Sequence, residues 1–263
     1  MNPHSTPEAA DAARYEILRC VVGSQVLGLN LPGTDDLDMM GICLEPPEYV
    51  VGLRTFEQWI SRTKADGEPQ PEGARSGPGD VDLVVYSARK WCRLALSGNP
   101  TVLLPLFVPE EHTLAITPAG HALRYLAPAF ASRQAGRAFL GYMTQQRERM
   151  TGERGGKHTN RPELIEQYGM DTKYCYHMLR LGMQGVEFLR TGRITLPVPE
   201  PARGFLLDVR TGGVPMAEAL RVAAVYERTM KGLLTSSPLP ERPDAAAVER
   251  WLLETYAEAW RQP

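Results

Sequence analysis

The chain has 263 residues, of which 43% are hydrophobic and 23% are charged, and its formal net charge is −2. This is the composition of an ordinary soluble globular protein, long enough to bury a core without disulfides or a structural metal. The near-neutral charge excludes sequence-independent binding of nucleic acid through an overall positive charge. A local basic patch would still suffice for such binding.

The cysteines and the hydrophobic pattern indicate where the protein works. The four cysteines stand in apolar stretches and form no C-x-x-C pair, so we expect reduced, buried thiols at Cys20, Cys43, Cys92 and Cys175. The chain does not begin with the basic and then apolar run of a signal peptide, and no stretch approaches the roughly 18 apolar residues that span a bilayer. We therefore predict a cytoplasmic protein that binds no membrane, and its oligomeric state stays open.

Helices and strands alternate in the first part of the chain. In chain order, the patterns predict a helix at 7–19, the end of a strand at 20–22, a strand at 37–44, a helical or irregular stretch at 53–63, a flexible Gly- and Pro-rich loop at 64–80, a β-branched strand at 81–86 and a helix at 88–96 capped by Ser87. The alternation is typical of an α/β or α+β unit.

From about residue 114 onward the pattern is mainly helical. The expected helices cover 117–127, where Thr117 is the cap, and then 131–150, 171–191, 206–210, 215–234 and 244–261. We therefore predict an α+β fold with a small mixed-sheet domain at 1–112, followed by a mainly helical domain at 113–263.

One stretch of the first domain carries recognisable chemistry. Gly23-Ser24 follows a short apolar run, and Asp36 and Asp38 come about a dozen residues later, entering the strand at 37–44. Aspartates at i and i+2 on a strand point to the same face, so both can bind the same metal ions. A Gly-Ser at a helix start offers backbone N–H groups and a hydroxyl to phosphates. Hard oxygen ligands of this kind predict two Mg²⁺ or Mn²⁺ ions.

A third carboxylate is expected on a neighbouring strand. Asp82 opens the strand at 81–86, and Asp80 has the same parity but lies at the end of the flexible loop. We favour Asp82, because a metal ligand on a strand is held more firmly than one on a loop. Each feature alone also fits a surface turn or an ordinary strand-to-helix connection, and only the whole set points to a metal site.

Three stretches of the chain resemble known nucleotidyltransferases. The stretch VVGSQVLGLNLPGTDDLDMMGI resembles the signature of the DNA polymerase beta nucleotidyltransferase superfamily. The stretches RKWCRLALSGNPTVL and KHTNRPELIEQYGMDTKYCYHMLRLGMQGVEFLRTGRITLP look like the RNA repair pathway DNA polymerase beta family. The resemblance implies a palm-like catalytic domain with a helical partner, two divalent metal ions and a role in RNA end repair.

The expected helix at 171–191 carries a polar stripe. Lys173, His177 and Arg180 lie at spacings of four and three residues, and the stripe continues through Gln184 and Glu187. Such a stripe would bind a triphosphate or an RNA backbone, or it is an ordinary solvated face. Lys157, in a Gly-rich basic loop, is a further candidate phosphate contact, with a mobile surface loop as its alternative.

These features predict a nucleotidyltransferase. Asp36, Asp38 and Asp82 would bind the metal ions and act in catalysis, and Gly23, Ser24, Lys157, Lys173, His177 and Arg180 would bind the nucleotide. A nucleoside monophosphate would move from an NTP, ATP among them, to an acceptor hydroxyl with release of pyrophosphate. The expected acceptor is an RNA end. The alternatives are a protein or small-molecule acceptor, or a non-catalytic nucleotide-binding, antitoxin-like module.

Overall fold

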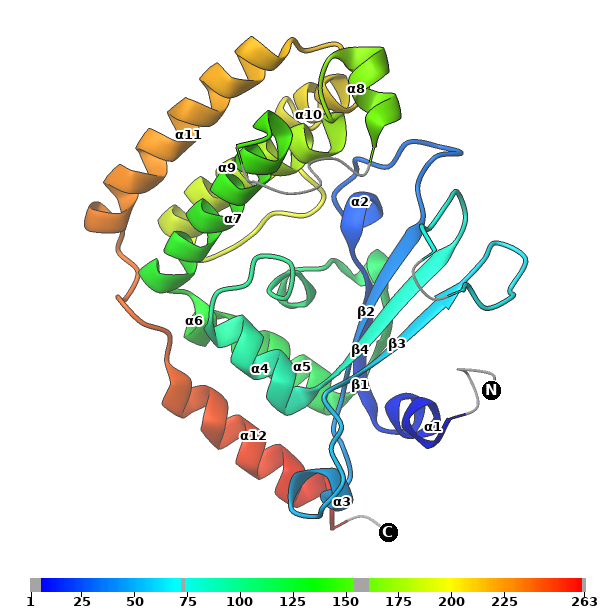
Figure 1. The fold of residues 1–263 in the computed structure, drawn as a ribbon. Helices are drawn as coiled ribbons and strands as arrows, with labels where there is room; N and C mark the ends of the chain where they lie inside the picture. Colours follow the sequence, from blue (N-terminus) through cyan, green and yellow to red (C-terminus); the bar gives the residue numbers. More distant parts are fainter. Residues whose placement is uncertain (1–5, 72–73, 154–160, 262–263) are drawn as a thin grey trace. The chain divides into compact units, whose positions relative to one another are not determined.

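The structure is a computed structural model that describes residues 6–71, 74–153 and 161–261. These residues form two compact units that alternate along the chain (Figure 1). Unit 1 comprises the described residues of 1–96, 102–129 and 244–263, and unit 2 those of 97–101 and 130–243. Both helices and strands are present, which confirms the predicted α+β class.

Unit 1 is built on a five-stranded mixed sheet with the strand order β3-β4-β2-β1-β5. The strands are β1 Glu16–Val21, β2 Leu37–Cys43, β3 Gln58–Thr63, β4 Val81–Ser87 and β5 Thr113–Ile116. Neighbouring β2 and β4 run parallel, and the other pairs are antiparallel. The parallel pair lies inside the sheet, because β3 pairs with the other edge of β4 and β1 with the other edge of β2.

Helices connect the strands of unit 1 and pack against its sheet. They are α1 Pro7–Arg14, the short α2 Gly23–Val26 and α3 Pro47–Val50, α4 Ala88–Leu96, α5 Pro118–Tyr125 and α12 Ala245–Ala259, with 3₁₀ turns at Leu104–Leu106 and Glu110–His112. The core on one face joins Ala12 of α1 to Leu83 and Val85 of β4. Ser87 caps α4 and Thr117 caps α5 through their hydroxyls, as predicted.

The last helix, α12, belongs to unit 1 and is tied to it by a buried polar contact. The Tyr256 hydroxyl donates to a carboxylate oxygen of Glu45 at 2.5 Å, and Trp260 Nε1 donates to the Glu45 carbonyl at 3.2 Å. Only 2% of Glu45 is exposed, so burial raises the pKa of its carboxyl, while the Tyr256 hydrogen bond lowers it. This contact links residues more than 200 positions apart in the sequence.

Unit 2 is a helical bundle around α9 Thr172–Thr191. The other helices are α7 Arg133–Thr151, α8 Pro162–Tyr168, α10 Ala202–Arg210 and α11 Met216–Ser236. The short α6 Ala127–Phe130 lies where unit 1 ends and unit 2 resumes. Helices α7, α10 and α11 all pack on α9. Phe139 of α7 stacks on Phe188 of α9 with ring centroids 5.4 Å apart. None of the described helices combines the length and the apolar character of a membrane span.

Three expectations about secondary structure were wrong. The first helix ends at Arg14 rather than at residue 19, and residues 16–21 form a strand that is paired on both sides. Residues 58–63, expected to be helical or irregular, form β3 at the edge of the sheet. Residues 113–116 form β5 at the other edge, where a mainly helical pattern and no strand were expected. In each case pairing with a neighbouring strand overrides a weak local pattern.

The four cysteines are all free and buried, as predicted. Burial raises the pKa of the Cys20 thiol to about 12, and burial likewise raises that of Cys175 to about 12. Thiols of this kind stay protonated and unreactive at neutral pH.

We predict that Tyr256→Phe lowers the free energy of unfolding by about 1–3 kcal/mol, because a buried carboxylate loses a hydrogen bond. Urea or thermal unfolding of the full chain measures this loss. Tyr125→Phe is the matched control, because Tyr125 is 85% exposed. Equal stability of the two variants would show that the Tyr256–Glu45 contact does not stabilise unit 1.

Candidate active site

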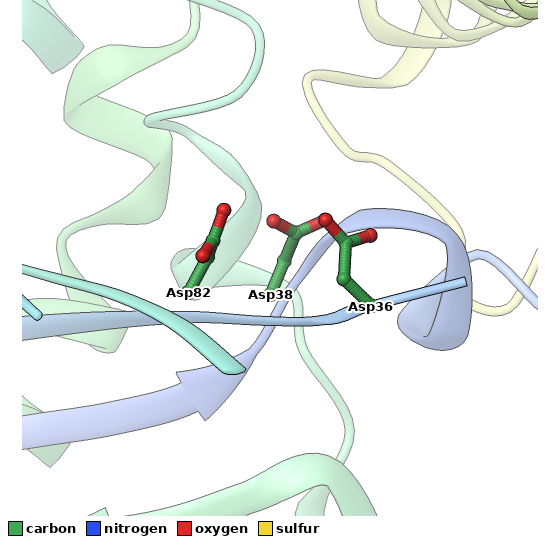
Figure 2. A group of neighbouring side chains, drawn as sticks. All are labelled: Asp36, Asp38 and Asp82. Carbon is green, nitrogen blue, oxygen red and sulfur yellow. The ribbon is translucent and has the colours of Figure 1, made fainter. Parts of the chain in front are cut away.

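Three aspartates gather at one end of the parallel strand pair in unit 1. Asp36, Asp38 and Asp82 each present a carboxylate oxygen, and these oxygens lie within 4.8 Å of one another. All three side chains are half-buried. Figure 2 shows the carboxylates turned toward the same space, with Asp38 between the other two. The structure thus brings together the three carboxylates that the sequence suggested.

The pairing of the strands explains this geometry. Asp38 of β2 stands directly opposite Asp82 of β4 in the parallel register. Residues of this parity point away from the face on which Leu83 and Val85 join the core. Asp36 lies two residues before Asp38, at the entry to β2. The chain is anchored there by the Leu37 N–H, which donates to the Asp80 carbonyl at 2.7 Å.

Asp80 has a different position from the three clustered aspartates. Its carboxylate accepts hydrogen bonds from the Ala65 and Gly77 N–H groups at 3.0 and 2.7 Å and from Gln70 Nε2 at 2.5 Å. These contacts make Asp80 the organiser of the 64–80 loop. The geometry supports Asp82, rather than Asp80, as the third carboxylate.

Gly23 lies directly against the carboxylate of Asp38. Its φ of +67° is in the left-handed region, and a Cβ atom built on it would meet Asp38 Oδ2 at 2.1 Å. Only glycine fits this position without displacing the aspartate. Ser24 follows in the short α2 and is 9% exposed. The Gly-Ser pair therefore lies beside the acidic cluster, as its spacing in the sequence predicted.

Two further residues contact Asp82 and were not anticipated. The Ser76 hydroxyl donates to the two carboxylate oxygens at 2.8 and 2.9 Å, and Arg62 Nε lies 3.8 Å from Oδ2. Ser76 comes from the loop at 64–80 and Arg62 from β3. Sequence reasoning missed both, because β3 was not recognised as a strand and the loop carried no pattern that places Ser76.

The candidate residues of the helical half lie in unit 2. Lys173, His177 and Arg180 project from α9, and Asp171 caps that helix by accepting from the Lys173 and Tyr174 N–H groups. The stripe is not a solvated face, because Arg180 is 5% exposed. Lys157 lies outside the described residues.

His177 is held in its neutral form. Burial is the main cause that lowers the pKa of its imidazole well below the ordinary value, and the nearby cations, first Arg180 and then Lys173, lower it further. A neutral imidazole can both donate and accept a hydrogen bond. The side chain therefore adds no charge to a region that is already positive.

The arginines of α7 differ in their partners. Arg133 and Arg137 pair with Glu241, and Arg147 pairs with Glu227. These ion pairs offset the positive charge of the three arginines. Arg149, in the last turn of α7, is exposed.

The acidic cluster has the donor chemistry of a site for hard divalent cations. Three carboxylates within mutual reach are the ligands that Mg²⁺ and Mn²⁺ prefer, and their repulsion is relieved when a cation binds between them. The glycine against Asp38 keeps the backbone close without a side chain in the way. The residues present therefore fit a divalent metal.

An acidic cluster beside a Gly-Ser turn on a mixed sheet is the arrangement expected of a nucleotidyltransferase. Comparison with known families agrees: residues 9–254 match the RNA repair pathway DNA polymerase beta family. The chain belongs to this family, and it is a polymerase beta-like nucleotidyltransferase.

Comparisons with individual proteins add less. No curated protein matches. A similar solved structure is a nucleotidyltransferase-like protein from Exiguobacterium sibiricum, 13% identical, with a TM-score of 0.30; the match covers 97% of this chain and 79% of that one. A likeness this distant carries no argument about the site.

Removal of a clustered carboxylate should weaken metal binding. We predict that Asp38→Asn and Asp82→Asn each reduce Mn²⁺ affinity about tenfold or more, because each loses a charged ligand. Asp80→Asn is the control and should bind Mn²⁺ within about twofold of the wild type, since its carboxylate faces the loop. Calorimetric titration of the full chain measures all three. A larger loss in Asp80→Asn than in Asp82→Asn would reverse the assignment of the third ligand.

The fit of Gly23 against Asp38 is testable by a pair of alanine variants. Gly23→Ala and Gly33→Ala impose similar backbone strain, since their φ angles are +67° and +73°, but nothing lies within 4 Å of the new Cβ at Gly33. We predict that this backbone strain lowers the free energy of unfolding by about 1–2 kcal/mol in both variants. Only Gly23→Ala should also lose Mn²⁺ affinity, because it displaces Asp38. Equal metal affinity in the two variants would contradict this role for Gly23.

Proposed function

We propose that the chain moves a nucleoside monophosphate from an NTP to the hydroxyl of an RNA end and releases pyrophosphate. The observation that carries this proposal is the cluster of Asp36, Asp38 and Asp82, with Gly23 packed against it. Membership of a family described by RNA repair supports the choice of acceptor.

In this proposal the aspartates hold the metal. Asp36 and Asp38, two residues apart, would bind two divalent ions, and Asp82 on the adjacent strand would complete the site. When bound, Mg²⁺ or Mn²⁺ would draw charge from the phosphates and lower the pKa of the attacking hydroxyl. Gly23 and Ser24 would receive the outer phosphates of the NTP.

Asp82 is proposed to receive the acceptor hydroxyl. Its carboxylate already accepts hydrogen bonds from the Ser76 hydroxyl at 2.8 and 2.9 Å, so one side of it is accessible to an O–H group. An acceptor hydroxyl held there would pass its proton to the Asp82 carboxylate as its oxygen attacks the α-phosphorus. The bond from the α-phosphorus to the oxygen that bridges to the β-phosphorus would break, and pyrophosphate would leave. In this mechanism Ser76 has to leave before the acceptor arrives.

The helical unit is proposed to bind substrate phosphates. Lys173, His177 and Arg180 of α9 remain the candidate contacts, with Lys157 outside the described residues. Arg180 is the strongest of them, because its guanidinium is buried and forms no ion pair among the described residues.

Labelled NTPs test the proposal directly. The purified chain is incubated with each NTP, Mg²⁺ or Mn²⁺, and total RNA, and we expect label on RNA for the wild type and the Asp80→Asn control but none for Asp38→Asn. Label on a protein or a small molecule instead would keep the chemistry and replace the acceptor. Binding of NTP with no transfer to any acceptor would contradict the proposal.

A further inference from the structure

A cavity of about 280 Å³ lies wholly within unit 2, between α7 and α9. The residues that matter for its chemistry are Tyr142 and Arg149 of α7, Arg161, and Tyr174, His177 and Arg180 of α9. This volume is several times the roughly 30 Å³ that a water molecule occupies in the liquid. The cavity can therefore hold a polyatomic ligand.

Arg180 is a buried cation whose hydrogen bonds are incomplete. Its Nη1 donates to Gln184 Oε1 at 2.8 Å, but its Nε has no hydrogen-bond partner in the described part of the chain. Gln184 is fully buried, and its Nε2 also has no partner. A guanidinium cannot shed its proton at physiological pH. A buried cation without a counter-ion is costly, and an anion bound beside Arg180 would offset this cost.

The described residues that line the cavity do not balance its positive charge. Three arginines line it, and none of the described residues that line it is acidic. Asp171 pairs with Arg161 at 3.1 Å, which offsets one of the three. The segment at 154–160 reads RGGKHTN and contains no carboxylate that could offset the others. The excess positive charge belongs to Arg149 and Arg180.

We infer that this cavity is a phosphate-binding site of the helical unit, with Arg180 as its buried anchor and Arg149 and Arg161 at its wall. Planar guanidinium groups match the oxygens of a phosphate in two-pronged contacts. Neutral His177 and the Tyr142 and Tyr174 side chains supply further polar contacts at the wall. The site needs no metal, unlike the acidic cluster of unit 1.

This inference deepens the proposed function and rests on it for the choice of ligand. A nucleotidyltransferase that acts on RNA ends meets phosphate groups from two sources: the triphosphate of the NTP and the phosphorylated terminus of the RNA. Both offer the same chemistry to Arg180. The binding experiment therefore includes a separate arm for each source.

The test is calorimetric titration of the full chain in EDTA. EDTA keeps divalent metal ions away from the acidic cluster of unit 1, so phosphate binding through such ions does not contribute. The probes are inorganic tripolyphosphate, ATP, and one oligoribonucleotide prepared with a 5′-phosphate, a 3′-phosphate or hydroxyl ends. We expect wild-type protein to bind tripolyphosphate and Arg180→Gln to bind it about tenfold more weakly or worse. Arg190→Gln, the same charge change at an exposed position of α9, is the matched control and should bind as the wild type does.

The outcomes separate this site from the proposed chemistry. Asp38→Asn should still bind tripolyphosphate, because the acidic cluster takes no part. Tighter binding of ATP than of any RNA would assign the site to the triphosphate, and tighter binding of phosphorylated than of hydroxyl-ended RNA would assign it to the RNA terminus. Absence of binding by the wild type, or equal binding by Arg180→Gln and Arg190→Gln, would overturn the inference.

A stability measurement shows whether the Arg180→Gln variant folds. Because the guanidinium of Arg180 has no counter-ion among the described residues, we expect Arg180→Gln to melt at or above the wild-type temperature. If it instead fails to fold, the exposed Arg149→Gln replaces it and should weaken tripolyphosphate binding about threefold or more. Unchanged binding in Arg149→Gln would then overturn the inference.

Discussion

The parallel pairing of β2 with β4 is the constraint on which the acidic site depends. It sets Asp38 opposite Asp82, and the alternation of a strand brings Asp36 to the same side. A slip of one residue in this register would turn Asp82 toward the core and replace it by an apolar neighbour. The buried residues of the two strands, such as Ile42 and Val85, fix the register and thereby the spacing of the carboxylates.

Three clustered carboxylates repel one another, and the protein offsets only part of this cost. Arg62 and Ser76 both approach Asp82, and Gly23 brings the backbone against Asp38. Unit 2 contains the opposite imbalance: the buried Arg180 pairs with no carboxylate in the described part of the chain. Features of this kind lower stability in the free chain and are retained where a ligand of opposite charge restores the balance.

The local motifs were more predictable than the fold around them. The Gly-Ser turn, the two aspartates entering β2 and the cap residues Ser87 and Thr117 all depend on chemistry within a few residues, and the sequence displays it. The edge strands β3 and β5 depend on their neighbours, and their own patterns are weak. The contact of Ser76 with Asp82 depends on the conformation of a loop, and the contact of α12 with Glu45 joins distant parts of the sequence. No periodic pattern in the sequence predicts either contact.

The central claim is that Asp36, Asp38 and Asp82 form one divalent-metal site. A crystal soaked with Mn²⁺ and a non-hydrolysable NTP tests it most directly, because the anomalous signal of Mn²⁺ locates the ions. We predict anomalous peaks between the three carboxylates, with the triphosphate beside Gly23 and Ser24. Peaks only at Asp80 and the 64–80 loop, or a bound nucleotide with no peak at the cluster, would contradict the account.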